Sequence, residues 1–191
     1  LRIALALAQE KPDNSVTYLQ RIEQEAERLE ELIGQLLATQ PQALTLDSHI
    51  DLVPILRQLC ADANFEGQGE GKTFSFNADT QQAIVDSAGD LLHKSFDNIL
   101  RNALYHTGGN TEVSVSLKSA DGVYIVTIED SGPGVPDSAL QSIFGEFYRV
   151  DTARTRESGG YGLGLAIAKR ALVQHGGNVT AQNTGSGLKI I

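Results

Sequence analysis

Apolar residues in the first forty positions recur at alternating spacings of three and four. The series is Leu19, Ile22, Ala26, Leu29, Ile33 and Leu36. Such a pattern is typical of a helix that packs against other helices along one seam. Residues 1–10 are rich in Ala and Leu and predict a preceding helix, separated by a turn at 11–14. Two helices cannot close such a core alone, so we expect a second chain to complete a four-helix bundle.

A different pattern follows a linker at 39–44. In chain order it predicts a strand at 49–53, a helix at 54–66, strands at 72–77 and 82–87, a helix at 88–106, a hairpin at 112–130, a helix at 161–175 and strands at 178–182 and 187–191. The hairpin turn is expected at Asp121-Gly122. Helices combined with a mostly antiparallel sheet predict an α+β fold, built as a two-layer α/β sandwich. We therefore expect a helical segment at 1–40 and a separate domain at 45–191.

Composition and charge narrow the possible functions. The formal net charge of −9 argues against a general nucleic-acid surface, because phosphate backbones favour basic faces. The single cysteine, Cys60, excludes an internal disulfide and is expected to pack in a helix. No apolar run reaches membrane-spanning length, and no signal peptide is visible. We expect the chain to be a fragment, because Leu1 falls within an apolar helix and Ile191 within an apolar run.

Four glycines stand at 159, 160, 162 and 164, directly before the last predicted helix. Helix N-termini bind anions, and glycine lets a ligand approach the backbone, so the stretch is a candidate phosphate site. A P-loop is excluded because Leu165 and Ala166 follow the last glycine. A dinucleotide fingerprint is excluded because 149–158 is too charged for the strand that must precede it. A flexible hinge before a surface helix is the alternative interpretation.

Two other segments carry candidate chemistry. Asn98 and Asn102 lie four residues apart on one helix face and offer amide oxygens to a hard cation such as Mg²⁺, although two solvated polar residues would look the same. Asp130 follows the second hairpin strand in the sequence EDSGPG, where a carboxylate can accept a hydrogen bond from an amino group. A tight turn is the simpler interpretation of that sequence.

The region between these motifs holds side chains suited to a loop above a polyphosphate. Three aromatic residues could pin such a loop, namely Phe144, Phe147 and Tyr148. Three arginines could contact phosphate, namely Arg149, Arg154 and Arg156.

Taken together and in this order, the motifs resemble the ATP-binding domain of bacterial sensor histidine kinases, in the GHKL superfamily shared with gyrase, Hsp90 and MutL. NILRNA resembles the N box, DSGPG the G1 box, FGEFYR the F box, GYGLG the G2 box and GSG at 185–187 a late G3 element. The heptad segment resembles the second helix of the kinase dimerisation domain. The sequence is most similar to the CpxA-type envelope-stress sensor kinases, and the resemblance covers nearly the whole chain.

The resemblance implies a Bergerat-type fold that binds ATP and Mg²⁺. By this resemblance Asn98 and Asn102 would hold the metal ion, Asp130 would receive the adenine amino group, and Asn98 and Arg149 would serve catalysis. A lid would run from about Val135 to Gly160. The further ATP-binding positions that it implies are His106, Gly132, Gly134, Gly160, Tyr161, Gly162, Leu163 and Gly164.

The implied activity is transfer of the γ-phosphoryl group to a histidine on the dimer bundle, and then to an aspartate of a response-regulator receiver domain. The protein would act as a homodimer and form the cytoplasmic portion of an inner-membrane sensor, held in the membrane only through other segments. Hydrolytic members of the superfamily carry a glutamate where this chain has Asn98, which cannot act as a general base. None of the four histidines lies on the first bundle helix, so the acceptor is expected upstream of Leu1.

One departure from the family pattern keeps alternatives open. The usual basic residue three positions after the second asparagine is Tyr105 here, and His106 replaces a frequent aromatic residue. This departure leaves phosphate contact by this turn open. Separately, a nucleotide-binding scaffold, or a phosphatase-biased sensor without kinase activity, is the alternative function. A gyrase- or MutL-like ATPase is disfavoured by Asn98 and by the bundle helix.

Overall fold

The computed structural model describes residue 46, residues 48–150 and residues 162–191. The helices are α3 (Leu52–Gly67), α4 (Leu91–His106) and α5 (Gly164–Gln174), with short 3₁₀ turns η2 (Gln68–Glu70), η3 (Asp137–Ala139) and η4 (Ser142–Phe144). The strands are β1 (Ser48–Asp51), β2 (Thr73–Ala78), β3 (Ile84–Ser87), β4 (Glu112–Ala120), β5 (Val123–Glu129), β6 (Ala181–Asn183) and β7 (Leu188–Ile190). The predicted helical segment at 1–40 lies outside the described residues, so its bundle and its boundary with the next domain stay predictions.

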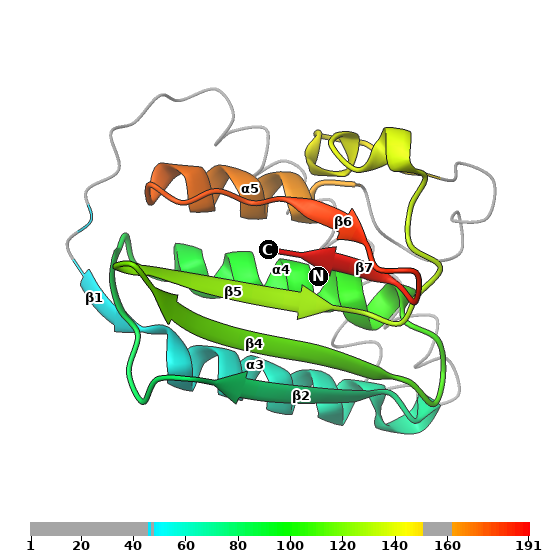
Figure 1. Ribbon diagram of the computed structural model, residues 1–191, viewed down its shortest axis with the longest axis horizontal. Helices are drawn as coiled ribbons and strands as arrows, with labels where there is room; N and C mark the ends of the chain where they lie inside the picture. The colour runs from blue at the N-terminus through cyan, green and yellow to red at the C-terminus, as the bar shows by residue number, and fades with distance from the viewer. Residues whose placement is uncertain (1–45, 47, 151–161) are drawn as a thin grey trace, which may run out of the picture.

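Five strands form one sheet in the order β2-β4-β5-β7-β6 (Figure 1). Strand β2 runs parallel to β4, and the other neighbouring pairs are antiparallel. Strands β1 and β3 pair separately as an antiparallel ribbon at one end of the domain, in the register Ser48 to Ser87. We call this pair the β1–β3 ribbon. The predicted mostly antiparallel sheet is confirmed, but the separate ribbon was not foreseen.

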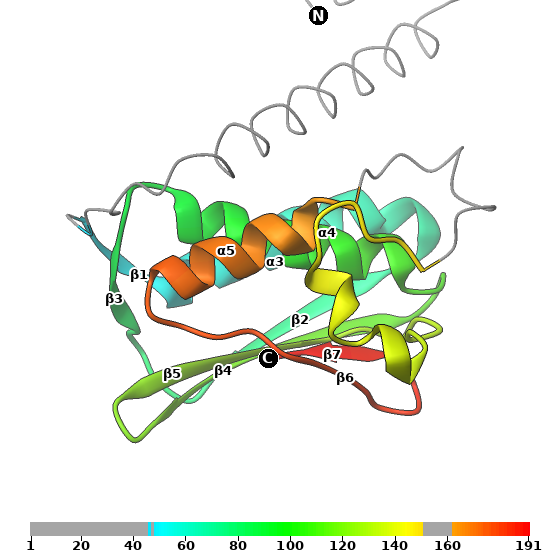
Figure 2. The same cartoon turned by 90° about the horizontal axis from the view of Figure 1, so that it is seen from above.

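Helices α3, α4 and α5 cover one face of the sheet and leave the other face open (Figure 2). Strand β4 shows the cause, because Val113, Val115 and Leu117 are buried while Ser114 between them is exposed. Residues from all three helices join the same core, for example Leu56, Leu100 and Ala168. Cys60 is part of that core, as expected, and burial raises its pKa to about 11. The two-layer α/β sandwich is confirmed.

The turn between β4 and β5 follows its sequence signal. Asp121 and Gly122 both have a positive φ, 50° and 79°, which is the backbone of a type I′ hairpin turn. Asp and Gly tolerate this left-handed region better than other residues do, so the register of the hairpin is fixed locally.

Several predicted boundaries were wrong, including the following three. The strand expected at 49–53 ends at Asp51, because the Asp51 carboxylate caps α3 by accepting the Val53 amide at 3.0 Å. Strand β6 begins at Ala181 and not at 178, although Thr180 still exchanges two backbone hydrogen bonds with Ile191. Helix α5 begins at Gly164 and not at 161, because Gly162 has φ +74°, outside helical geometry.

No helix within 48–150 or 162–191 is long and apolar enough to cross a membrane.

Candidate functional site

Helix α4 presents two asparagines beside its buried face. The core-facing side of the helix consists of Leu92, Ser95, Phe96, Ile99, Leu100 and Ala103. Asn98 and Asn102 are both half-buried and follow one another along the helix, as the spacing predicted. No hydrogen bond joins either side-chain amide to another residue that the structure describes. Their oxygens therefore remain available to a ligand.

Helix α5 begins next to these asparagines. A Cβ added to Gly164, its first residue, would stand 3.6 Å from Asn98 Oδ1. No side chain caps this end, and the first backbone hydrogen bond within the helix runs from the Ile167 amide to the Leu163 carbonyl at 2.9 Å. The amides of the first turn before Ile167 thus have no partner among the described residues, at a helix end that lies beside Asn98. Free amides at a helix N-terminus are an anion-binding group.

The backbone conformation at Gly162 explains why the motif has a glycine at this position. Its φ of +74° suits glycine alone, and a Cβ there would meet the Tyr148 carbonyl oxygen at 2.7 Å. The segment before α5 is therefore held against the backbone of Phe147 and Tyr148. Leu163, the next residue, is buried. Gly160 and Tyr161 lie outside the described residues, so the structure says nothing of their implied roles.

Asp130 is a buried carboxylate with one oxygen fixed by the fold. Its Oδ1 accepts the amides of Gly132 at 2.8 Å and Leu188 at 3.1 Å, and its side chain and backbone together are 5% exposed. No described donor reaches Oδ2, and no described side-chain oxygen is both fully buried and without a partner. Oδ2 therefore reaches the surface, as an acceptor that a ligand donor could satisfy.

The glycines around Asp130 are required by contacts within the chain. A Cβ on Gly132 would lie 2.6 Å from the His106 carbonyl oxygen, and Gly134 has φ +68°. A Cβ on Gly187 would lie 1.8 Å from the Asp130 carbonyl oxygen, closer than any atoms can approach. These contacts bring the end of α4 and the start of β7 onto the Asp130 turn. The ATP-binding roles that the resemblance implies for Gly132 and Gly134 are therefore not needed to explain these glycines.

The electrostatics of His106 link three elements. Burial is the main cause that lowers the pKa of His106 below its ordinary value of 6.5, although part of the residue stays exposed. The negative charge of Asp130 opposes this lowering, and the positive charge of Arg149 adds to it. Because such effects act at short range, the ring of His106 lies near both charges. The end of α4, the end of β5 and the segment after η4 therefore converge.

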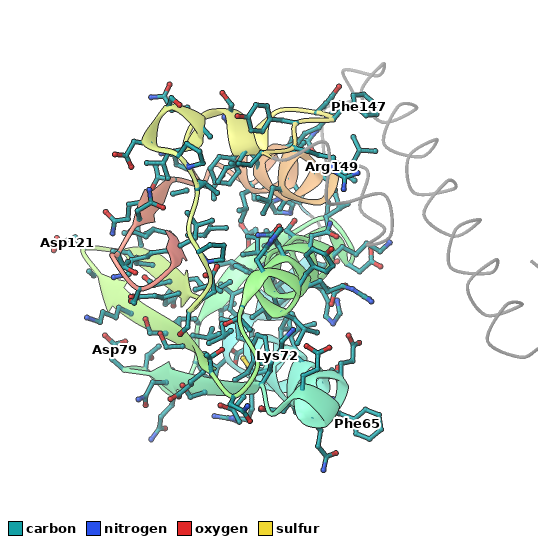
Figure 3. The ribbon with its side chains drawn as sticks, turned by 90° about the vertical axis from the view of Figure 1, so that its right-hand side faces the viewer. Phe65, Lys72, Asp79, Asp121, Phe147 and Arg149 are labelled. Carbon is teal, nitrogen blue, oxygen red and sulfur yellow. The ribbon has the colours of Figure 1, made fainter. Side chains whose placement is uncertain are left out.

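The three aromatic residues of the loop after Asp130 differ in burial. Phe144 in η4 is buried, and Lys169 of α5 stands 5.7 Å above its ring. Phe147 and Tyr148 are 49% and 37% exposed, and Phe147 has φ +61°. In Figure 3 the Phe147 ring points away from the ribbon. Of the three aromatic residues, Phe144 is thus the one that is buried among the described residues, and pinning by Phe147 and Tyr148 stays a prediction.

Two hollows among the described residues lie away from this site. One, of about 700 Å³, is lined by Thr80, Gln81, Gln82, Ile84 and Tyr124. The other, of about 350 Å³, is lined by Phe144, Glu146, Ala166, Lys169, Arg170, Val173 and Gln174. Neither includes Asn98, Asn102 or Asp130, so the candidate site is argued from side-chain chemistry and helix placement. Residues 151–161, which include Arg154 and Arg156, lie outside the described residues.

Sequence reasoning missed three polar contacts that hold the site's framework. Lys72 is buried and its Nζ donates to the Leu104 carbonyl at 3.0 Å, near the end of α4 (Figure 3). The Asn183 side chain accepts the Val135 amide at 3.0 Å and so fixes the start of the loop after Asp130. His175 joins α5 to the segment before α4. A lysine within a glycine-rich loop and a histidine before two glycines were the only signals.

Comparison with known proteins agrees with this geometry. Residues 88–191 match the family described as histidine kinase-, DNA gyrase B- and HSP90-like ATPases. Over its whole length the chain is 35% identical to the sensor histidine kinase CpxA of Escherichia coli, of which it covers 42%. Over 94% of its length it is 34% identical to the sensor protein VanS of Enterococcus faecium, of which it covers 48%. The chain thus spans less than half of each relative.

Solved structures share the fold at lower identity. The histidine kinase AdeS of Acinetobacter baumannii superposes with a TM-score of 0.70 at 16% identity, over 99% of this chain and 93% of that one. Full-length ShkA, solved in complex with AMPPNP, gives a TM-score of 0.71 at 23% identity, over 91% of this chain and 37% of that one.

The family match covers α4, Asp130 and α5, the same elements whose side chains converge in the structure. The resemblance to sensor histidine kinases that the sequence motifs indicated is therefore confirmed. The chain belongs to the family of histidine kinase-, DNA gyrase B- and HSP90-like ATPases.

Proposed function

We propose that this domain binds Mg²⁺-ATP between α4 and α5 and donates the γ-phosphoryl group to a histidine. The observation that carries the proposal is the approach of Asn98 to Gly164, which sets one of the two asparagine side chains beside an uncapped helix N-terminus. Phosphate groups are stabilised by free helix amides, and a hard cation is bound by amide oxygens together with phosphate oxygens. Both needs of a metal-bound polyphosphate are met within one helix pair.

Adenine recognition is assigned to Asp130. Its Oδ1 is fixed by two backbone amides, so the orientation of Oδ2 is fixed as well. In that orientation Oδ2 would accept a hydrogen bond from the amino group of adenine. Guanine has a carbonyl oxygen in place of that amino group and would face the carboxylate with an acceptor. The site would therefore prefer ATP to GTP.

The residues present fit a magnesium ion shared with phosphate. The residues that the structure describes contain no group of three His, Cys, Asp or Glu side chains able to hold a metal by themselves. Asn98 and Asn102 supply two neutral oxygens, which leaves the remaining positions to phosphate and water. Such an ion would neutralise charge on the polyphosphate. The chain's own contribution is to hold the phosphates at the start of α5 and Arg149 close by.

Transfer to histidine, not hydrolysis, is supported by Asn98. A neutral amide cannot take a proton from water, so bound ATP would persist until another nucleophile reaches it. CpxA and VanS are named as sensor proteins, and CpxA as a histidine kinase. By analogy we propose a homodimer formed through the 1–40 segment, a response-regulator receiver domain as the next acceptor, and a place on the cytoplasmic side of an inner-membrane sensor.

The sharpest test of the nucleotide site is Asp130→Asn. The asparagine keeps Oδ1 as the acceptor for Gly132 and Leu188 but turns Oδ2 into an NH₂ donor. We expect ATP affinity to fall by roughly 5- to 150-fold, as for a lost buried hydrogen bond, and GTP affinity to rise relative to it. Titration calorimetry with both nucleotides measures this.

The matched control is Asp79→Asn. Asp79 also accepts a backbone amide, that of Ser119 at 3.0 Å, but it follows the edge strand β2. Its substitution should leave both affinities unchanged. Equal ATP affinity in wild type and Asp130→Asn would remove Asp130 from the site. Nucleotide binding without phosphorylation of an added histidine-bearing bundle segment would favour the nucleotide-binding scaffold instead.

A further inference from the structure

His175 uses both ring nitrogens at the end of α5. Its Nδ1 lies 2.6 Å from the Ala171 carbonyl oxygen, and its Nε2 lies 3.2 Å from both the Ala88 amide nitrogen and Ser87 Oγ. A carbonyl oxygen can only accept and a backbone amide can only donate. Nδ1 therefore carries the proton and Nε2 accepts, which defines a neutral ring with one tautomer.

The ring is not needed to end the helix. The backbone already does so, because the amides of Gly176 and Gly177 donate to the carbonyls of Val173 and Leu172 at 3.0 and 2.9 Å. The imidazole instead joins α5 to residues 88 positions earlier in the chain. Its contribution is therefore a link between two elements and not a helix cap.

The far side of the link is the β1–β3 ribbon. Ser87 is its last residue, is fully buried, and pairs in register with Ser48 of β1. All residues before 48 are joined to the domain through β1. Ala88 follows Ser87 on the way to α4. A displacement of the ribbon therefore acts directly on the two partners of the His175 ring.

The other end of α5 is the candidate phosphate site. An α-helix of 11 residues is about 16 Å long and behaves as one rigid element over that length. The end of α5 lies beside the end of β3, where His175 contacts Ser87, and its start lies beside α4 (Figure 2). Because Gly164 approaches Asn98 there, a small shift or tilt of the helix changes the distance between the amides and the asparagine face.

We propose that His175 is a positioning residue that couples the β1–β3 ribbon to the nucleotide-binding end of α5. The proposal deepens the proposed function and rests on it for its effect on ATP. Through the hydrogen bonds of His175 to Ser87 and Ala88, a movement of the chain segment before β1 would reach the phosphate site. Coupling through such a link is measurable as an energetic interaction between the two ends.

The test compares His175→Ala, His175→Gln and Ser87→Ala in the 191-residue chain. We expect His175→Ala to weaken ATP binding by roughly 3- to 30-fold, the range of measured coupling effects. His175→Gln should restore part of the affinity, since its amide oxygen can accept the Ala88 amide. Ser87→Ala should weaken binding less, and the double variant should lose less than the sum of the two single effects.

A second readout uses nucleotide-free protein. Hydrogen exchange of the Ile167 amide, which makes the first hydrogen bond of α5, should accelerate in His175→Ala more than that of the core amide of Val115. His49→Ala is the control, because His49 lies on the same ribbon and its partner among the described residues is the exposed Asp86. It should change neither readout.

The outcomes separate the two proposals. If wild type fails to bind ATP, the proposed function fails, while selective exchange at Ile167 still supports the coupling. If His175→Ala lowers the Tm but accelerates Ile167 and Val115 equally and leaves ATP affinity unchanged, His175 is only a structural contact and the inference is overturned. Additive effects of Ser87→Ala and His175→Ala would also overturn it. If His175→Ala does not fold, His175→Gln and Ser87→Ala carry the same comparison.

Discussion

Some polar atoms of the candidate site are held by hydrogen bonds within the fold, and others have no described partner. Asp130 commits Oδ1 to the fold and leaves Oδ2 at the surface, whereas Asn98 and Asn102 keep their whole amide groups free of described partners. A fixed acceptor gives selectivity because its direction cannot adjust to a wrong base. Free amides suit a cation, whose ligand shell is completed by phosphate and water. His106 and Arg149 lie at the boundary between these two groups.

The convergence of His106, Asp130 and Arg149 predicts how His106 titrates. Burial lowers the His106 pKa, so its NMR titration midpoint should fall below 6.5. Asp130→Asn removes a charge that raises this pKa and should lower the midpoint further. Arg149→Gln removes a charge that lowers it and should raise the midpoint. An unchanged midpoint in both variants would show that the three side chains do not meet.

The lowered pKa of His106 also predicts how the free energy of unfolding changes with pH. Between the folded-state pKa of His106 and 6.5, the unfolded chain binds a proton that the folded chain does not. The free energy of unfolding should therefore decrease as the pH falls through 6.5, and His106→Gln should remove that part of the decrease. Urea unfolding of both proteins at several pH values measures the difference.

At the scale of elements, the site depends on where α4 ends and where β7 begins. Lys72 supplies a donor to the last turn of α4, whose carbonyls lack partners within the helix. Gly187 lets β7 approach Asp130 closely enough for the Leu188 amide to reach its carboxylate at 3.1 Å. Lys72 and Gly187 are not themselves candidate ligand-binding residues. Each of them nevertheless holds in place an element of the site, Lys72 the end of α4 and Gly187 the start of β7.

Lys72→Met should destabilise the domain through α4. The methionine keeps the buried stem but leaves the Leu104 carbonyl without its donor, at a cost of about 1–3 kcal/mol. Lys94→Met is the control, because Lys94 and Asp90 form an exposed pair whose loss should cost less than about 1 kcal/mol. Urea unfolding compares them, and equal losses would contradict the role of Lys72.

Gly187→Ala should be among the most damaging single methyl additions in the chain. A Cβ at 1.8 Å from the Asp130 carbonyl oxygen forces β7 away from β5, so we expect a loss of about 3 kcal/mol or more in the free energy of unfolding. At Gly69 no described atom lies within 4 Å of an added Cβ. Gly69→Ala should therefore change stability by at most about 1 kcal/mol. Similar stability of the two variants would refute the close approach.

For the whole molecule, local patterns predicted the elements and left their mutual contacts open. Helix α4 and the Asp121-Gly122 turn are set by neighbours in sequence, and both were predicted. The contact of Ser87 with His175 joins residues 88 positions apart, and nothing local marks it. Phe147 shows the same limit, because an aromatic residue in an apolar segment predicts burial unless its φ is known.

The candidate site was predictable to the same extent. Motif order identified Asn98, Asn102 and Asp130, and the structure adds that Asn98 meets Gly164 and that Asp130 is held by Leu188. The shared role of these residues in binding a nucleotide stays a proposal.

The most direct test of Mg²⁺-ATP binding between α4 and α5 is an NMR titration of the isotope-labelled chain. With Mg²⁺-ATP, the account predicts shifts at the backbone amides of Gly132 and Gly164 and at the side-chain amides of Asn98 and Asn102. Without Mg²⁺, the shifts of the two asparagine side chains should be largely lost while that of Gly132 persists. The account is contradicted if ATP causes no shifts, or if they gather at the hollow lined by Phe144 and its neighbours.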